Sequence, residues 1–311
     1  MFTYDKDLLI DHLELWLDSK RVKEFGFISH GHTDHIARHK KIICSEPTAD
    51  FINIRLKNPN YLPLKYNQPH HINGATITLH PAGHILGSSQ IKIKSNGVSL
   101  LYTGDFRISP AKTVEAFEFI NSDILIMETT FGLPHYKFPS RESMETELLE
   151  LCTSTLRAGK TPVIFAYTLG KGQEALKIIS DAGLPVAVDY PILRFIPIYQ
   201  KFGVEFQKFS KFKKNSIEQN VLILPVNARY RREYKDPAKY FTIYLSGWGI
   251  DQSAPYRLGV NKVLPLSDHA DYDELIQLVE TTKPGQIYCT HGFDQFVDIL
   301  KNNGFKAELL K

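Results

Sequence analysis

Residues 30–35 read His-Gly-His-Thr-Asp-His, a pattern of side chains that can bind metal ions. Histidines two apart on an extended segment project the same way, so His30 and His32 can share one ion. The adjacent Asp34 and His35 would then face a second ion beside it. Imidazole and carboxylate ligands suit zinc, and also manganese or iron. The segment predicts a metal centre, against the alternative of a chance histidine cluster on a surface loop.

Three further candidate ligands stand at the ends of predicted strands, and a two-metal site needs ligands beyond the histidine cluster. His84 lies between glycines in Ala-Gly-His-Ile-Leu-Gly, Asp105 in Tyr-Thr-Gly-Asp and His291 in Cys-Thr-His-Gly. For each residue alone, a structural role is an equal alternative. As a set they favour metal ligation, since sites collect where loops meet a sheet edge.

The elements that must position these residues are short strands and helices in alternation. The predicted strands are 24–29, 75–79, 90–94, 98–102, 124–127, 161–167, 185–188, 221–224, 242–245 and 286–289. The predicted helices are 143–156, 172–180, 275–280, one from Phe293 and one directly after the histidine cluster. The order is β-rich, then βαβ-like, then α/β, with chemistry-bearing residues on both sides of the middle block. An insertion within one domain is therefore favoured over two domains in series.

Length and composition fit a globular enzyme. The 311 residues suffice for one large domain with an insertion or for two domains, and 43% hydrophobic residues allow a sizeable core. No stretch approaches the roughly 20 apolar residues that span a bilayer, and no basic-then-apolar leader is evident. The three cysteines are far apart, which argues against a disulfide framework or a thiolate zinc site. A cytoplasmic location without membrane association is the expectation.

Charge is concentrated in residues 201–240. This segment holds ten Lys or Arg against four acids, a net charge of +6, although the whole chain carries only +3. Amines contact phosphates and aromatic rings can stack on bases, so the segment suits an anionic polymer; a solvated lysine-rich loop is the alternative. The interleaved aromatic residues are Phe206, Phe209, Phe212, Tyr230 and Tyr234.

The succession HxHxDH, AGH, strand-TGD and a late His-Gly resembles the metallo-β-lactamase superfamily over nearly the whole chain. The resemblance implies that Asp105 bridges two metal ions. It implies one ion on His30, His32 and His84 and another on Asp34, His35 and His291. Asp18, in Leu-Trp-Leu-Asp, matches the first acidic motif of the superfamily and is expected to orient the histidine loop without touching metal.

Glu128, in Met-Glu-Thr-Thr, and His269, in Ser-Asp-His-Ala-Asp, resemble the additional motifs of the β-CASP nucleases. The implied fold is an α/β protein, an αββα metallo-β-lactamase sandwich with an inserted α/β β-CASP cap. Residues 1–132 and 256–311 would form the sandwich and residues 133–255 the cap. A histidine beside a carboxylate keeps its proton and can protonate a leaving alkoxide, so these two residues, with Asp34, are the catalytic candidates. The structural alternatives are a capping or salt-bridged acid and a buried polar residue in a turn.

The phrases HIARH, PAGHILGS, LYTGDF and METTFGLP are similar to bacterial exonucleases associated with a DNA ligase and a helicase. This similarity implies a phosphodiesterase with two divalent metal ions, zinc first and manganese as the alternative. It favours DNA as the partner, with a ligase or helicase acting alongside. His291 is retained as in RNA-processing members, which keeps a ribonuclease as the alternative.

Two residues of the middle block are candidate nucleic-acid contacts. Lys171 follows a predicted strand and opens a predicted helix, where free backbone amides favour phosphate; a plain surface turn is the alternative. Trp248, in Ser-Gly-Trp-Gly, can stack on a base or fill a hinge.

Two other functions compete with the nuclease. A small-molecule hydrolase of the same fold, such as a thioesterase or lactonase, explains the metal ligands but not Glu128, the inserted block or the basic segment. A binding protein with a degenerate site is disfavoured by the full ligand set.

Overall fold

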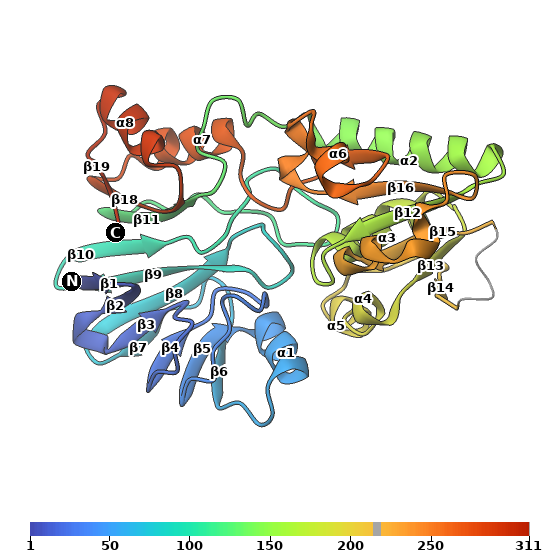
Figure 1. Ribbon diagram of the computed structural model, residues 1–311. Coiled ribbons are helices and arrows are strands. Elements are labelled where there is room, and N and C mark those ends of the chain that lie inside the picture. The colour runs from blue at the N-terminus through green and yellow to red at the C-terminus, as the bar shows by residue number, and fades with distance from the viewer. Residues whose placement is uncertain (214–218, 311) are drawn as a thin grey trace. The chain divides into compact units, whose positions relative to one another are not determined.

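The computed structural model describes residues 1–213 and 219–310 of the chain. The chain packs as two compact units (Figure 1). Unit 1 comprises Met1–Pro110, Val114–Tyr136 and His269–Lys311, and unit 2 comprises Ala111–Thr113 and Lys137–Asp268. Within the part of the chain that the structure describes, no helix has the length and apolar character needed to cross a membrane.

Unit 1 contains two β-sheets. The first has six strands in chain order, with the short 3-10 helix η1 (Asp11–Leu13) between its second and third: β1 (Phe2–Asp5), β2 (Asp7–Ile10), β3 (Leu15–Leu17), β4 (Phe25–Phe27), β5 (Lys41–Ser45) and β6 (Tyr61–Leu64). The second has the order β19-β18-β11-β10-β9-β8-β7. Its strands are β7 (His70–Ile72), β8 (Ala75–Pro81), β9 (Ser89–Ser95), β10 (Val98–Tyr102), β11 (Ile124–Thr129), β18 (Gln286–Gly292) and β19 (Ala307–Leu309).

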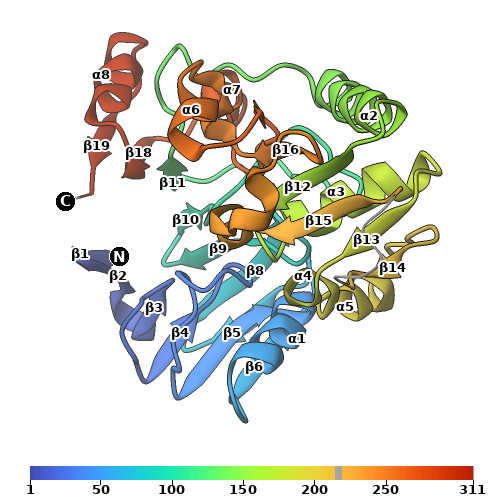
Figure 2. The same ribbon diagram turned by 45° about the vertical axis from the view of Figure 1, so that its right-hand side comes forward.

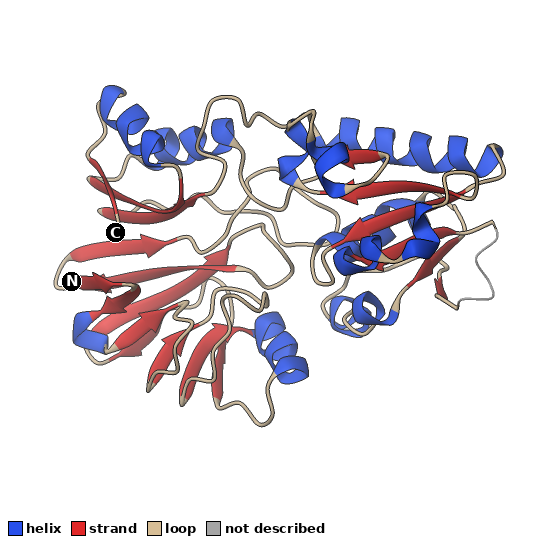
Figure 3. Cartoon of the chain, in the orientation of Figure 1, coloured by secondary structure: helices blue, strands red, loops and turns tan. Residues whose placement is uncertain are grey.

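The layers of unit 1 follow from the side-chain alternation of its strands. In β8 the buried side chains of Ala75, Ile77 and Leu79 alternate with half-buried ones and join the core between the two sheets. Helix α1 (Glu46–Arg55) packs on the outer face of the first sheet. Helices α7 (Tyr272–Thr282) and α8 (Asp294–Asn302) cover the outer face of the second (Figure 3). The predicted αββα sandwich is confirmed.

Unit 2 is an α/β unit built on a parallel six-stranded sheet of order β14-β13-β15-β12-β16-β17 (Figure 2). Its strands are β12 (Thr161–Ala166), β13 (Val186–Val188), β14 (Ser210–Lys211), β15 (Val221–Pro225), β16 (Tyr240–Leu245) and β17 (Lys262–Leu264). Its helices are α2 (Arg141–Arg157), α3 (Lys171–Asp181), α4 (Tyr190–Leu193), α5 (Ile196–Lys201), α6 (Ala254–Leu258), η2 (Val226–Tyr230), η3 (Arg232–Lys235) and η4 (Gly247–Ile250). Separate apolar cores fill the two faces of this sheet.

The chain after the histidine cluster is not helical. Turns and irregular chain follow the cluster, and the next helix, α1, begins only at Glu46, so the helix predicted there was wrong. The assignment of 133–255 to a cap stays a prediction; unit 2 itself runs on to Asp268, because β17 pairs with β16. In the basic segment, Lys214 and Glu218 lie outside the described residues.

The aromatic side chains of the basic segment are mostly not available to a ligand. Tyr234 is buried, and Phe206, Phe209 and Phe212 pack partly buried against the two cores of unit 2. Only Tyr230, of the five predicted to interleave with the cations, is an exposed ring. These aromatic residues contribute to the cores of unit 2, because burial of a large apolar ring against a sheet stabilises the fold.

Candidate metal centre and proton donor

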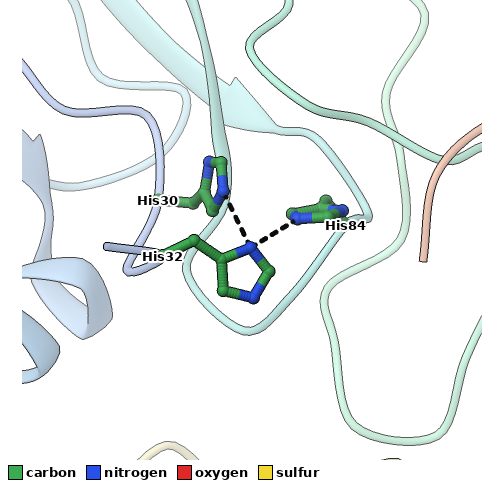
Figure 4. A group of neighbouring side chains, drawn as sticks. All are labelled: His30, His32 and His84. Carbon is green, nitrogen blue, oxygen red and sulfur yellow. Dashed lines mark hydrogen bonds between the residues drawn. The ribbon is translucent and has the colours of Figure 1, made fainter. Parts of the chain in front are cut away.

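Three histidines of unit 1 bring their ring nitrogens to one point (Figure 4). Nδ1 of His32 lies 3.1 Å from Nε2 of His30 and 3.1 Å from Nε2 of His84. A neutral imidazole has only one N–H, so three converging nitrogens satisfy each other poorly by hydrogen bonds. Ligands on a tetrahedral ion with bonds of 2.0–2.1 Å stand about 3.3 Å apart, close to the spacing here. The donor set therefore fits a divalent cation such as zinc.

Asp105 and His35 extend this cluster. The Asp105 Oδ2 atom lies 3.4 Å from Nε2 of His35, 3.7 Å from Nε2 of His30 and 3.8 Å from Nε2 of His84. His30, His35 and Asp105 form a second group with metal-ligand spacing among the described residues. One carboxylate thus stands between two sets of imidazoles, the position expected of a bridging ligand.

The loops that carry the ligands are tied together by backbone contacts. His84 follows β8, and Asp105 follows β10. Arg107 N donates to the carbonyl of Ala82 at 3.0 Å, which fixes the two loops to each other. Gly83 has a φ of +74°, and a Cβ at this position would overlap the Arg107 carbonyl. Glycine is therefore required here both for the turn and for the close approach.

Hydrogen bonds orient the histidine rings. The Ser29 hydroxyl lies 2.9 Å from Nδ1 of His30, which leaves Nε2 to face the cluster. Asp18 accepts from Ser29 N at 2.7 Å and from the Tyr102 hydroxyl at 2.9 Å, and its Oδ2 lies 3.0 Å from Nδ1 of His35. Asp18 is thus placed to turn the His35 ring toward Asp105; its role in orienting a metal ligand stays a prediction.

The surroundings shift the pKa values of His30, His35 and Asp105 in different directions. Burial, with the neighbouring His35 and His84, holds the pKa of His30 well below its ordinary value, which favours the neutral, metal-binding imidazole. Burial alone would also lower the pKa of His35, but the carboxylates of Asp105 and Asp18 outweigh it and raise that pKa well above its ordinary value. Burial opposes ionisation of Asp105, yet His35 and the other imidazoles hold the Asp105 pKa well below the ordinary value.

Two predicted ligands lie apart from these groups. Asp34 is exposed, with its Oδ2 atom 3.9 Å from Nε2 of His35. His291 is exposed with a φ of +48°, at a register shift where β11 pairs Glu128 with Thr290 and Thr129 with Gly292. Because of this bulge, no residue of β11 pairs with His291. Neither residue joins a metal-ligand group among the described residues, so their ligation stays a prediction.

Glu128 and His269 form a pair beside the cluster. Nδ1 of His269 lies 2.9 Å and 3.1 Å from the two Glu128 carboxylate oxygens. The rings of His84 and His269 are 4.6 Å apart, and His84, Asp105 and His269 form a third group with ligand spacing. With Nδ1 turned to Glu128, Nε2 is the nitrogen of His269 that can transfer a proton at the centre.

Glu128 is buried and held by several donors. Phe106 N donates to its Oε1 at 2.9 Å, and the Thr130 hydroxyl donates to Oε2. Because Phe106 directly follows Asp105, the same carboxylate fixes both the Asp105 loop and the His269 ring. The sequence pattern singled out Glu128 and His269 but did not indicate this link.

Lys171 is placed differently from expectation. It opens α3, as predicted, but its side chain is buried and its ammonium forms an ion pair with Asp268, also within unit 2. A buried, paired ammonium is not positioned to bind a phosphate, so the direct contact predicted for Lys171 finds no support. Its partner Asp268 is bonded to His269 in the chain. Trp248, in η4, is exposed as a contact residue would be.

Side chains in the first turns of α2 and α3 bind two other segments of unit 2, residues 111–113 and residues 267–268. Glu174 pairs with Arg141 at 2.9 Å and accepts from the Thr113 hydroxyl, and Arg141 donates to the Ser267 carbonyl at 3.1 Å. The segment Gly-Lys-Gly-Gln-Glu therefore anchors 111–113 and 267–268 on unit 2. Sequence reasoning missed this network, because its partners are distant in the chain.

The layered fold and the His/Asp cluster define a protein of the metallo-β-lactamase fold. Residues 253–306 match the family described as "Zn-dependent metallo-hydrolase RNA specificity domain", a range that includes His269 and His291. The chain belongs to the β-CASP family of this fold.

The names of three relatives refer to DNA or to an RNase. A "Probable DNA ligase" of Opitutus terrae is 34% identical over 309 residues, which is 98% of this chain and 30% of that protein. An "RNase J-like protein" of Methanocaldococcus jannaschii is 28% identical over 218 residues, 60% of this chain and 52% of that protein. The "DNA cross-link repair protein SNM1" of Arabidopsis thaliana is 27% identical over 300 residues, 85% of this chain and 60% of that protein. The chain thus spans less than two thirds of each relative.

Proposed function

We propose that the chain hydrolyses phosphodiester bonds in nucleic acid, using two divalent metal ions and a histidine proton donor. The observation that carries the proposal is the Glu128–His269 pair, which stands at hydrogen-bond distance directly beside the His/Asp cluster. A thioesterase has no need of this pair, because a thiolate departs more readily than a sugar alkoxide.

The proposed ligands are His30, His32 and His84 for one ion and Asp34, His35 and His291 for the other, with Asp105 between them. Zinc is the preferred ion, with manganese as the alternative. When bound, two such ions lower the pKa of water toward neutrality and neutralise charge on a phosphate. Asp18 and Ser29 hold the imidazoles in the orientation that ligation requires.

The protein's own contribution to bond cleavage is the proton. As water adds to phosphorus and the P–O bond to the sugar breaks, His269 donates the proton from Nε2 to the departing sugar oxygen. Glu128 stabilises the protonated ring before transfer and keeps Nδ1 turned away from the substrate. Because Glu128 is buried, water competes little for its carboxylate, and the hydrogen bond to His269 is stronger as a result.

DNA is the proposed substrate, with exonucleolytic removal of nucleotides from a strand end. Similarity over nearly the whole chain to a protein named a probable DNA ligase, and to one named for DNA cross-link repair, supports a role with DNA ends that a ligase then seals. RNA is the second candidate, because the matched family is described by RNA specificity and another relative as RNase J-like.

Digestion of single-stranded DNA and RNA oligonucleotides, labelled at either end, tests the proposal with zinc or manganese added. A ladder shrinking from one end supports an exonuclease and gives its polarity, whereas internal fragments support an endonuclease. A thioester assayed in parallel tests the small-molecule hydrolase. Turnover of the thioester with neither oligonucleotide cleaved contradicts the proposed function.

A further inference from the structure

The loop that carries His84 makes a tight turn between β8 and β9. It comprises residues 82–88, here called the His84 loop, and two of its glycines have left-handed backbone conformations, with φ of +74° at Gly83 and +78° at Gly87. Inside the loop, the Ser88 hydroxyl accepts a hydrogen bond from His84 N at 3.0 Å. The backbone of His84 is therefore held by Ser88, and the residues that fix this end of the loop also fix His84.

The segment 114–120, also in unit 1, contacts this loop and is here called the strap. Its Glu115 carboxylate accepts from Gly87 N, at 3.0 Å to Oε2 and 3.3 Å to Oε1. The Gly87 carbonyl is bound separately, by the hydroxyls of Ser45 at 2.6 Å and Thr48 at 2.8 Å. The N–H and the C=O of Gly87 are thus both fixed, one by the strap and the other by the first residues of α1 and its N-cap.

The strap is itself fixed at a second point, Glu118. The Glu118 carbonyl accepts from Gln90 Nε2 at 2.8 Å, and its side-chain Oε1 accepts from Asn67 Nδ2 at 2.9 Å. Between the two glutamates, Phe117 lies directly against the His84 loop, since a Cβ added at Gly83 would stand 3.3 Å from the Phe117 Cβ. The strap therefore contacts the loop at both of its left-handed glycines.

Stability alone does not account for the Glu115 carboxylate. Burial raises the pKa of Glu115 above its ordinary value, although the hydrogen bond from Gly87 N acts in the opposite direction. Within the described part of the chain, no lysine or arginine pairs with this carboxylate. A partly buried acid without a cationic partner costs stability, and such acids collect at functional sites. The carboxylate is therefore better explained by the loop it holds than by the core it enters.

We infer that Glu115 is a positioning residue for the metal centre, which acts through the Gly87 amide on the His84 loop. Gly87 is bonded to Ser88, and Ser88 holds His84 N, so the carboxylate is connected to the backbone of a proposed ligand. Positioning of this kind requires an acceptor oxygen at the right reach but not a negative charge. This inference rests on the proposed function and adds a residue that its metal centre depends on.

Competition for zinc between the full chain and a chromogenic chelator tests the inference. Glu115→Ala is expected to weaken zinc binding about 10-fold, the lower end of the range for residues that orient a ligand from outside. Glu115→Gln keeps an acceptor oxygen at the same reach and is expected to bind zinc within about two-fold of the unchanged chain. Glu115→Asp keeps the charge but is shorter by one methylene, so it is expected to resemble Glu115→Ala. The opposite order, with binding kept by Asp and lost by Gln, overturns the inference, because the carboxylate then acts by charge.

Asp123→Ala is the matched control. The Asp123 Oδ2 atom accepts from Ser99 N at 2.7 Å, so this variant also removes a carboxylate from a backbone amide of unit 1. Ser99 lies at the start of β10, whereas Asp105 follows the end of that strand. The control is expected to bind zinc within about two-fold of the unchanged chain, because distant sites act independently. A loss equal to that of Glu115→Ala overturns the inference, since any lost hydrogen bond in the unit would then have the same effect.

A double-mutant cycle shows whether Glu115 acts through His84. In a His84→Ala background, Glu115→Ala is expected to change zinc affinity by less than about two-fold, because the side chain that it positions is absent. Hydrogen exchange at saturating zinc follows the loop directly. Glu115→Ala is expected to speed exchange in residues 82–88, and Asp123→Ala is not. Full additivity in the cycle, or unchanged exchange in the loop, overturns the inference.

Failure of this inference and failure of the proposed function are distinguishable. If the unchanged chain cleaves an oligonucleotide and Glu115→Ala binds zinc equally tightly, the inference is wrong and the proposed function stands. If Glu115→Ala weakens zinc binding but the unchanged chain cleaves no oligonucleotide, the proposed function fails and Glu115 remains a positioning residue of a metal centre. If the unchanged chain binds no zinc or manganese, both are wrong.

Discussion

Replacing Lys171 by methionine is expected to destabilise unit 2 by about 3–5 kcal/mol, the usual cost of removing one partner from a buried ion pair. The side chains of Lys171 and Asp268 are only 10% and 6% exposed. The methionine fills the volume of the lysine stem but leaves the Asp268 carboxylate inside unit 2 without its countercharge. The free energy of unfolding should fall by a corresponding amount.

The double variant Lys171→Met/Asp268→Leu is expected to recover most of this loss. A buried pair replaced by apolar side chains of similar size often leaves stability unchanged or higher. The single variant Asp268→Leu completes the cycle, whose coupling energy isolates the pair. Urea denaturation in a Trp16→Phe background follows unit 2 specifically, because Trp248 then is the sole tryptophan.

Lys177→Met is the matched control on the same helix. Lys177 pairs with Asp181 one turn away, and that pair is more exposed, at 17% and 29%. Such helical pairs contribute about 0.3–0.5 kcal/mol, so this variant is expected to be nearly neutral. Equal effects of Lys171→Met and Lys177→Met would refute the reasoning, because burial of the first pair would then carry no energetic weight.

Four further outcomes are expected. His269→Gln should slow cleavage of an oligonucleotide about 10²- to 10⁴-fold but spare a p-nitrophenyl ester, whose leaving group needs no proton; equal losses in the two assays would remove His269 as the donor. Asp18→Asn should weaken zinc binding about 10- to 100-fold in a competitive titration with a chromogenic chelator, because His35 loses its orienting carboxylate. Chelation of metal should lower the melting temperature in calorimetry, since ligation favours the folded state; an unchanged melting temperature would argue against a metal centre. Burial raises the pKa of Asp7, but hydrogen bonds from Lys23, Ser19 and Arg21 outweigh it and lower that pKa overall. Its stabilising effect is therefore present above the unfolded pKa and lost as the pH falls through the folded one, so Asp7→Asn should cost stability in urea melts at pH 7 but little near pH 2.

The convergence of the His and Asp side chains was predictable, because each of these residues lies in a short motif that can be recognised in the sequence. His30 and His32 share a short segment, and His84 and Asp105 each follow a strand whose alternation is visible in the sequence. The ion pair of Lys171 was not predictable in this way, since its partner lies 97 residues further along the chain. A lysine at a helix start has the same sequence signature whether it binds phosphate or a buried aspartate.

The basic, aromatic segment illustrates a second limit of the sequence. Composition indicated a basic, aromatic segment at 201–240, yet of the five rings predicted to face a ligand, four pack inward and only Tyr230 is exposed. The cores that bury the other rings are built from strands in the order β14-β13-β15-β12-β16-β17, which differs from their order along the chain. Strand order depends on which crossovers pack best, and single-sequence patterns do not encode that choice.

The Glu128 carboxylate determines how the active-site variants must be interpreted. Its Oε1 atom accepts from Phe106 N at 2.9 Å and lies 2.9 Å from Nδ1 of His269, so one atom supports both the Asp105 loop and the proposed proton donor. Any substitution of Glu128 is therefore expected to disturb both the proposed metal ligation by Asp105 and the proposed proton transfer by His269. Loss of activity in such a variant cannot be assigned to either step. Only a change at His269, which leaves the Phe106 hydrogen bond in place, separates the two, and the dependence of its effect on the leaving group is the measurement that assigns the proton.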